Sequence, residues 1–215
     1  MYSMLTVNIY LPDQRLLRKR DYYYRKAKEE NYRSRAAYKL LQAARKYGFI
    51  KRGDVVVDLG AAPGGWLQAA RQLVGDEGFV LGVDIKEIKP LNFDNVRTIV
   101  GDIRDPETLK KIKDLLPRPA DAVISDVSPN VSGVWELDHA RQIELAEFSL
   151  NIALSTLRKG GNFFTKVFQG DLFHQFLSEV KEHFHQVRII KPEASRKRSA
   201  EIYVLGLNYR GGNQR

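Results

Sequence analysis

The 215-residue sequence contains no cysteine, which excludes a disulfide framework and any metal site built on thiolates. No uninterrupted apolar run reaches membrane-spanning length, and residues 1–14 lack the basic start and long apolar core of a secretory signal. We therefore expect a cytoplasmic protein. We also expect no metal, because no acids lie at zinc-binding spacing from the histidines. Two of the histidines, His183 and His185, are expected on the polar side of a helix. The four histidines are His139, His174, His183 and His185.

Positive charge is plentiful but unevenly distributed. The formal net charge is +9, yet residues 15–52 alone carry fourteen Lys/Arg and three acids, so the remainder of the chain is slightly acidic. Cations bind phosphates and aromatic rings stack on unpaired bases, so this composition predicts an RNA-binding arm. A solvated helical face is the alternative. A second basic run with net charge +3 spans residues 191–198. The tyrosines of the arm are Tyr22, Tyr23, Tyr24, Tyr32 and Tyr38.

The segment Val55–Trp66, VVVDLGAAPGGW, indicates a buried strand, a glycine-rich turn and the start of a helix. Aligned on Gly60, it reads G-A-A-P-G-G, without the middle glycine of the dinucleotide fingerprint, and Pro63 removes an N–H donor. The loop therefore suits an adenosine ligand without a phosphate. S-adenosylmethionine is the candidate, with Asp58 for its ammonium group. A tight turn that binds nothing is the alternative.

Two further acids follow expected strands. Asp84 ends the strand 79–84 and is placed to accept hydrogen bonds from the ribose hydroxyls of an adenosine, with a helix-capping role as the alternative. Asp102 follows the strand 97–100, where the adenine edge would be read. The expected cofactor contacts are Asp58, Gly60, Pro63, Gly64, Gly65, Trp66, Asp84, Ile85, Asp102, Ile103 and Asp126.

The alternation of short apolar strands with amphipathic helices predicts one doubly wound α/β sheet, with ligands at the carboxyl edge of its strands. Lys159, Gly160 and Gly161 are expected to end the helix 137–157 before the fifth strand. Only a basic loop separates the last two strands, so the final strand should run antiparallel to its neighbours. Strands are expected at 55–58, 79–84, 97–100, 122–125, 162–168, 187–190 and 201–209, and helices at 34–47, 65–74, 105–116, 137–157 and 171–184.

Four regions are expected along the chain. Residues 1–20 form a poorly defined lead-in, and residues 21–52 form the basic helical arm that binds RNA. Residues 53–210 form the core that binds S-adenosylmethionine, and residues 211–215 form a frayed tail.

Lys166 lies in FFTKVFQG with apolar residues on both sides. Lysine is rarely buried unless it is paired, so an acid at the same sheet edge is expected, and Asp126 is the natural partner. A lysine that merely reaches the edge is the alternative. Glu201, at the start of a strand, and Lys39, in the basic helix, fit the same cluster more weakly.

From about residue 18 to residue 209 the chain resembles the FtsJ/RrmJ-type ribose 2′-O-methyltransferases, although residues 1–14 match nothing in that family. The motifs are SRAAYKL around Lys39, DLGAAPGGW from Asp58, GVDI around Asp84, GDI at Asp102, SDVSPNVSG at Asp126, FFTKVFQG at Lys166 and KRSAEIYVL at Glu201. The family's catalytic Lys-Asp-Lys-Glu tetrad falls on Lys39, Asp126, Lys166 and Glu201 without substitution.

The resemblance implies a Rossmann-like class I methyltransferase with seven strands in the order 3-2-1-4-5-7-6, the last antiparallel, and helices on both faces. It also implies S-adenosylmethionine as methyl donor and the 2′-hydroxyl of an RNA ribose as acceptor. The expected acceptor is a uridine of large-subunit ribosomal RNA, because the short basic arm carries no added RNA-binding module. We expect a monomer.

The expected reaction is in-line displacement at the methyl carbon of S-adenosylmethionine. Lys166 would serve as base or alkoxide stabiliser, Asp126 would orient it, and Lys39 and Glu201 would hold the ribose. Three alternatives stay open: a tRNA acceptor, methylation of a base nitrogen, and a non-catalytic RNA-binding protein on the same scaffold. Base methylation is disfavoured because residues 126–129 read Asp-Val-Ser-Pro rather than Asn/Asp-Pro-Pro-aromatic.

Overall fold

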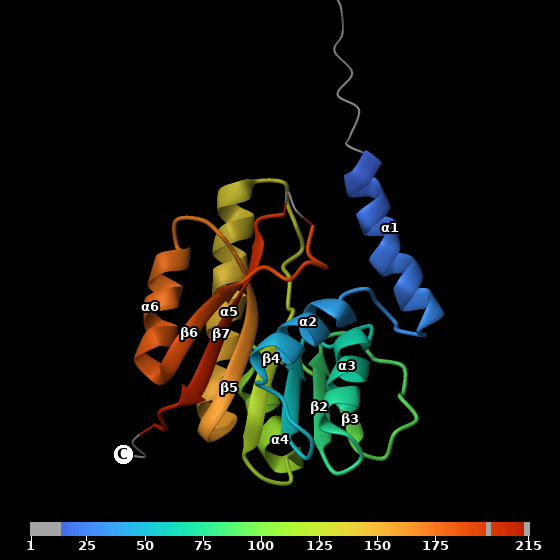
Figure 1. Ribbon diagram of the computed structural model, residues 1–215. Helices are drawn as coiled ribbons and strands as arrows, with labels where there is room; N and C mark the ends of the chain where they lie inside the picture. Colours follow the sequence, from blue (N-terminus) through green and yellow to red (C-terminus); the bar gives the residue numbers. More distant parts are fainter. Residues whose placement is uncertain (1–13, 197–198, 213–215) are drawn as a thin grey trace, which may run out of the picture.

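The computed structural model describes residues 14–196 and 199–212, arranged as a sheet between two layers of helices (Figure 1). The helices are α1 (Gln14–Glu29), α2 (Ala37–Tyr47), α3 (Gly65–Val74), α4 (Pro106–Leu115), α5 (Trp135–Thr156) and α6 (Phe173–His183). The strands are β1 (Val55–Leu59), β2 (Phe79–Asp84), β3 (Val96–Val100), β4 (Ala120–Ser125), β5 (Leu157–Phe168), β6 (Phe184–Ile190) and β7 (Glu201–Tyr209).

Within the described residues, seven strands form one sheet in the order β3-β2-β1-β4-β5-β7-β6. The five strands from β3 to β5 in this order are parallel to one another, and β7 runs antiparallel to both β5 and β6. Both the predicted strand order and the antiparallel last strand are therefore confirmed. In a sheet of this kind, ligands bind outside the carboxyl ends of the parallel strands.

Strand periodicity divides the core into two layers. Successive side chains of a strand point to opposite faces, so Val56 of β1 packs with α2 and α3 while Val55 and Val57 pack with α4, α5 and α6. On β5, Phe164 belongs to the first layer and Phe163 to the second. Each face of the sheet is thereby covered by its own apolar cluster.

The start of β5 differs from the prediction. The helix before it ends at Thr156, and the strand begins at Leu157, so Gly160 and Gly161 lie inside β5 rather than closing a helix. Ala120 of β4 pairs with Leu157, and Ala122 pairs with Asn162, so the extra residues of β5 bulge. Gly160, with a φ of 79°, supplies the left-handed conformation that this bulge requires.

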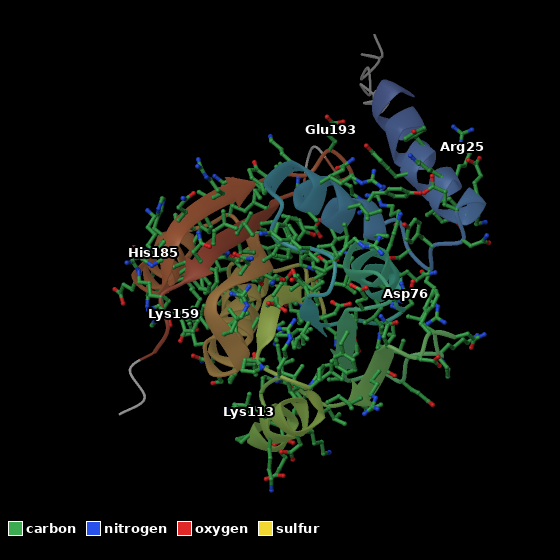
Figure 2. The ribbon with its side chains drawn as sticks, turned by 60° about the horizontal axis from the view of Figure 1, so that its bottom comes forward. Arg25, Asp76, Lys113, Lys159, His185 and Glu193 are labelled. Carbon is green, nitrogen blue, oxygen red and sulfur yellow. The ribbon has the colours of Figure 1, made fainter. Side chains whose placement is uncertain are left out.

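Other boundaries differ by a few residues. Helix α1 already begins at Gln14, before the expected start of the arm at residue 21, and α2 begins at Ala37 rather than Ser34. The expectation of a helical position for His185 is wrong: α6 ends at His183, and His185 lies exposed on β6 (Figure 2). The amphipathic pattern of the sequence continues beyond His183, where α6 ends, so the pattern alone does not mark the helix end. The lead-in of residues 1–13 and the last three residues of the tail lie outside the described residues.

None of the helices in the described part of the chain is long and apolar enough to cross a membrane.

Candidate active site

Four charged side chains from distant parts of the sequence meet at the carboxyl edge of the sheet. The Lys166 Nζ atom donates to the backbone oxygen of Asp126 at 2.8 Å and lies 3.5 Å from the carboxylate Oδ1 of Asp126. The Nζ atom of Lys39 lies 3.3 Å from Glu201 Oε2 and 3.9 Å from Asp126 Oδ1. Asp126 thus contacts both lysines, and the structure brings the four predicted residues together. Their chemical roles stay predictions.

Strand geometry explains why these side chains converge. Lys166 follows Phe164 by two residues on β5, and Phe164 packs in the layer that α2 covers. Side chains two residues apart on a strand share a face, so Lys166 points to the side of the sheet where α2 carries Lys39. Both lysines are buried. The cluster therefore depends on the packing of α2 on this face of the sheet. That packing brings Lys39 to Glu201, 162 residues away in the sequence.

Tyr203 joins this cluster, although the sequence analysis did not single it out. Its hydroxyl donates to Asp126 Oδ1 at 2.7 Å, and its ring lies 5.5 Å from the Lys39 Nζ atom. Burial, together with the neighbouring Asp126 carboxylate, raises the pKa of Tyr203 well above its usual value, so it is a proton donor here. Its position two residues after Glu201 on the same strand was a signal that could have identified it.

Asp126 is kept ionised by its partners. Burial alone would raise its pKa, but the Lys166 and Lys39 ammonium groups and the hydrogen bonds from Tyr203 and Lys166 outweigh that effect and lower the pKa. An ionised Asp126 can hold both lysine side chains in place. It also links the charged cluster to the neighbouring cavity, whose wall it forms in part.

A cavity of about 850 Å³ opens at the carboxyl ends of β1, β2, β3 and β4. Seven of the residues expected to contact the cofactor line it: Gly60, Pro63, Asp84, Ile85, Asp102, Ile103 and Asp126. The wall also contains residues that the sequence analysis did not identify as cofactor contacts. They are residues 127–130, three residues of α5 (Arg141, Glu144 and Leu145), and Ala62, Val83, Lys86, Glu87, Gly101 and Arg104. No local motif marks the α5 residues, since only the packing of that helix brings them there.

Asp58 lies fully buried near the end of β1, and neither of its carboxylate oxygens has a hydrogen-bond partner among the described residues. Burial, reinforced by the charges of Asp126 and Asp84, raises its pKa well above the usual value. Asp58 is not among the residues that line the cavity. Buried carboxylates are normally paired, so an unpaired one still fits a cationic ligand group. The amino group of S-adenosylmethionine is such a group.

Asp84 and Asp102 both face the cavity, but each already has partners in the protein. Asp84 accepts hydrogen bonds from the backbone N–H groups of Ala62 and Lys86. Asp102 pairs with the guanidinium group of Arg104, which lowers the pKa of Asp102. Each carboxylate oxygen has two lone pairs, so the single bond to each Asp84 oxygen leaves acceptor capacity for a ribose. Each Asp102 oxygen, in contrast, already accepts two hydrogen bonds from Arg104. Their expected roles stay predictions.

Like Asp58, the expected cofactor residues Gly64, Gly65 and Trp66 do not line the cavity. Trp66 is 3% exposed, stacks on Phe164 and donates to the backbone oxygen of Ala36. A Cβ atom on Gly65 would lie 2.2 Å from the Ser34 hydroxyl oxygen, so the glycine permits close approach of the chain segment before α2. These residues join the loop to the arm.

The basic arm presents rings and cations together. Tyr22 and Tyr24 are 50% and 53% exposed, whereas Tyr23 and Tyr38 pack in the core. Lys28 lies over the Tyr24 ring at 4.9 Å. Figure 1 shows α1 standing away from the sheet beside α2 and α3. The expected assignment of the arm to RNA stays a prediction.

Among the described residues, no group of three or more His, Asp and Glu side chains could hold a metal ion.

The sequence was compared with protein families and with known proteins. Residues 32–209 match the family model of FtsJ-like methyltransferases. Ribosomal RNA large subunit methyltransferase E of Methanococcus vannielii is 55% identical over 196 residues, which cover 91% of this chain and 76% of that protein. The protein of the same name from Methanothrix thermoacetophila is 57% identical over 187 residues, 87% of this chain and 72% of its own length.

Solved structures agree on the architecture. A Plasmodium falciparum protein described as a ribosomal RNA methyltransferase has a TM-score of 0.73 at 28% identity, covering 84% of this chain and all of that one. Aeropyrum pernix fibrillarin, solved with S-adenosyl-L-methionine bound, shares the fold with a TM-score of 0.52 at 20% identity, over 82% of this chain and 75% of its own. The chain therefore belongs to the FtsJ-like methyltransferase family.

Proposed function

We propose that this protein transfers the methyl group of S-adenosylmethionine to the 2′-hydroxyl of a ribose in large-subunit ribosomal RNA, acting on a uridine. One observation carries the proposal. Asp126 lines the cavity suited to the cofactor and also contacts Lys166, Lys39 and Tyr203. A hydroxyl held at this cluster would lie beside the methyl donor.

The cofactor would be held by the acids and backbone of the cavity. Asp58 would receive its ammonium group, Asp84 the ribose hydroxyls and Asp102 the adenine edge. Once bound, S-adenosylmethionine supplies a methyl carbon attached to a positively charged sulfonium leaving group. The protein must then position the acceptor and manage one proton.

Lys166 is the residue that would act on the acceptor hydroxyl. Its amine, held at the carbonyl and carboxylate of Asp126, would accept the proton or stabilise the oxyanion as it forms. Lys39 and Glu201, paired at 3.3 Å, would hold the ribose. Tyr203 fixes the Asp126 carboxylate that supports both lysines.

The choice of ribosomal RNA rests on the relatives. Proteins 51–57% identical to this chain, over 87–91% of its length, are named ribosomal RNA large subunit methyltransferase E. We infer the same acceptor here and propose that the basic arm of residues 21–52 binds it. We further propose that the protein acts in the cytoplasm as a monomer.

A Lys166→Ala variant tests the chemistry. We expect methyl transfer to ribosomal RNA to fall by about 10²- to 10⁴-fold while S-adenosylmethionine still binds. Lys159→Ala is the matched control, since Lys159 is an exposed lysine on the same strand (Figure 2) and should have no effect. Transfer by Lys166→Ala at nearly the wild-type rate would remove Lys166 from the reaction.

The acceptor is tested separately. Mapping of 2′-O-methylated nucleotides in total RNA, with and without the gene, should show one site lost from large-subunit ribosomal RNA. Loss of a tRNA site instead would overturn the proposed acceptor but leave the chemistry intact.

A further inference from the structure

We propose that Trp135, at the start of α5, is a stacking platform for an unpaired base of the RNA close to the methylated nucleotide. The inference rests on the proposed function, because it assigns a second contact to the same substrate. Trp135 is 45% exposed in a group of exposed apolar residues at this end of α5, with Val131, Val134 and Leu137. Large apolar side chains exposed together mark an interaction surface.

The Trp135 ring is held in a three-ring stack. Its centroid lies 5.7 Å from that of His139 with an interplanar angle of 14°, and 6.0 Å from that of Phe168 with an angle of 18°. His139 and Phe168 are both buried, whereas Trp135 is 45% exposed. A base would stack on the exposed part of the Trp135 ring.

The support beneath Trp135 is rigid. The buried His139 accepts a hydrogen bond at its Nε2 atom from the backbone N–H of Leu172. Gly170 lies against the same ring, and a Cβ atom there would come within 2.8 Å of it. A ring that is fixed before binding loses little conformational freedom on binding, which favours affinity.

The platform lies close to the proposed reaction centre. Gln142, two turns further along α5, donates to the backbone oxygen of Lys166. Seven residues separate Trp135 from Gln142 on the helix, which places the two about 10 Å apart along its axis. Phe168, which stacks on Trp135, is two residues beyond Lys166 on β5. At a spacing of about 3.4 Å per nucleotide along one strand, about 10 Å corresponds to about three nucleotide steps, so a base close to the methylated nucleotide is within reach.

Charge around the platform favours RNA over an apolar protein partner. Among its described residues, the β6–β7 connection carries the exposed cations Lys191 and Arg196. It ends beside Phe168, because Gln169 bonds to Ala200 and Phe168 pairs with Glu201. Figure 1 shows this connection next to the α5 end that carries Trp135. Phosphates would lie on that basic side. The exposed Glu136 disfavours a phosphate at the ring itself, which leaves a base face as the fitting group.

Tryptophan fluorescence tests the proposal directly, because the chain has only two tryptophans and Trp66 is buried. We expect a short single-stranded oligoribonucleotide containing the target site to quench wild-type emission. In Trp135→Phe, whose emission comes from Trp66 alone, the quench should vanish while RNA binding, followed by anisotropy of a labelled oligonucleotide, is largely kept. Trp135→Leu, which fills the site without a ring, should weaken RNA binding by about tenfold or more.

The controls separate stacking from folding and from the proposed chemistry. Phe93→Leu removes a comparably exposed ring, 44% exposed, from the β2–β3 connection and should leave RNA affinity unchanged. All variants should bind S-adenosylmethionine as the wild type does. Wild-type affinity for RNA in Trp135→Leu, or no quench at saturating RNA, would overturn the platform. So would a Trp135→Leu defect confined to self-association in sedimentation. A quench without any RNA methylation would support the platform and remove the proposed function instead.

Discussion

Asp58 is a fully buried carboxylate with no partner in the protein, held between the charges of Asp84 and Asp126. Its raised pKa in the folded state means that it favours folding at low pH and that this contribution is lost as the pH rises through that value. The cofactor-free protein is therefore destabilised at neutral pH by the residue that its ligand needs.

Asp58→Asn should accordingly raise the free energy of unfolding of the cofactor-free protein at neutral pH by about 1–3 kcal/mol. The gain should shrink as the pH falls below the raised pKa of Asp58. Denaturant unfolding at a series of pH values measures both effects. Asp121→Asn provides the contrast, because the buried Asp121 is paired with Arg158 and Arg118 and its loss should destabilise. Equal effects of the two substitutions would contradict the assignment.

Tyr203→Phe removes one hydrogen bond from Asp126, so the pKa of Asp126 should rise from its lowered value. The acid limb of the methylation rate should then move to higher pH, and the rate at neutral pH should fall by about tenfold. Tyr209→Phe is the control, because Tyr209 lies on the same strand and its hydroxyl bonds to the distant Leu154. An unshifted pH profile in Tyr203→Phe would show that Tyr203 does not support Asp126.

At the scale of single elements, the strands differ in how far the sequence alone predicts their boundaries. Strand periodicity correctly predicted β1, β2 and β7 almost to the residue, because each has apolar residues bounded by turn residues. The bulge in β5 could not be predicted, since Gly160 is equally typical of a helix end. Nor could the sequence tell that Trp66 faces the core rather than the ligand.

The arm itself carries a prediction. Arg25 and Lys28 are exposed cations three residues apart on α1, so replacing both with alanine should weaken RNA binding and lower the slope of log affinity against log salt by about 2. The pair Lys110 and Lys113 on α4 has the same spacing and exposure, and Lys113 lies at the opposite end of the view from Arg25 (Figure 2). That pair should leave the slope unchanged. If both double variants behave alike, the arm is not the RNA surface.

At the scale of the whole molecule, the order of the seven strands and the position of the ligand edge followed from the pattern of elements. The charged cluster followed only in part. The pairing of Lys166 with Asp126 joins neighbouring strands and could be argued from topology, whereas Lys39 meets Glu201 through the packing of α2 on the sheet, which no local pattern encodes. The stacking of Trp135 on Phe168 depends on tertiary packing in the same way.

The cofactor should stabilise the whole chain. At a hundredfold excess over its dissociation constant, S-adenosylmethionine contributes about 2.7 kcal/mol, which for a protein of this size raises the Tm by about 5–11 °C. Differential scanning fluorimetry measures the shift. In Asp58→Asn the shift should be largely lost although the cofactor-free protein melts higher. A full shift in that variant would mean that Asp58 does not hold the ligand.

The segment before α2 is fastened to the cofactor loop. Arg33 donates to the backbone oxygens of Pro63, Lys89 and Pro90, and its backbone N–H bonds to Gln68. The match to the family model starts at residue 32, next to this attachment. For protein engineering, this marks a boundary between interchangeable and fixed parts. A chimaera that exchanges α1 for another RNA-binding element should join the chain before Tyr32 and retain Arg33, so that a new acceptor is recruited without loosening the methyl-donor pocket.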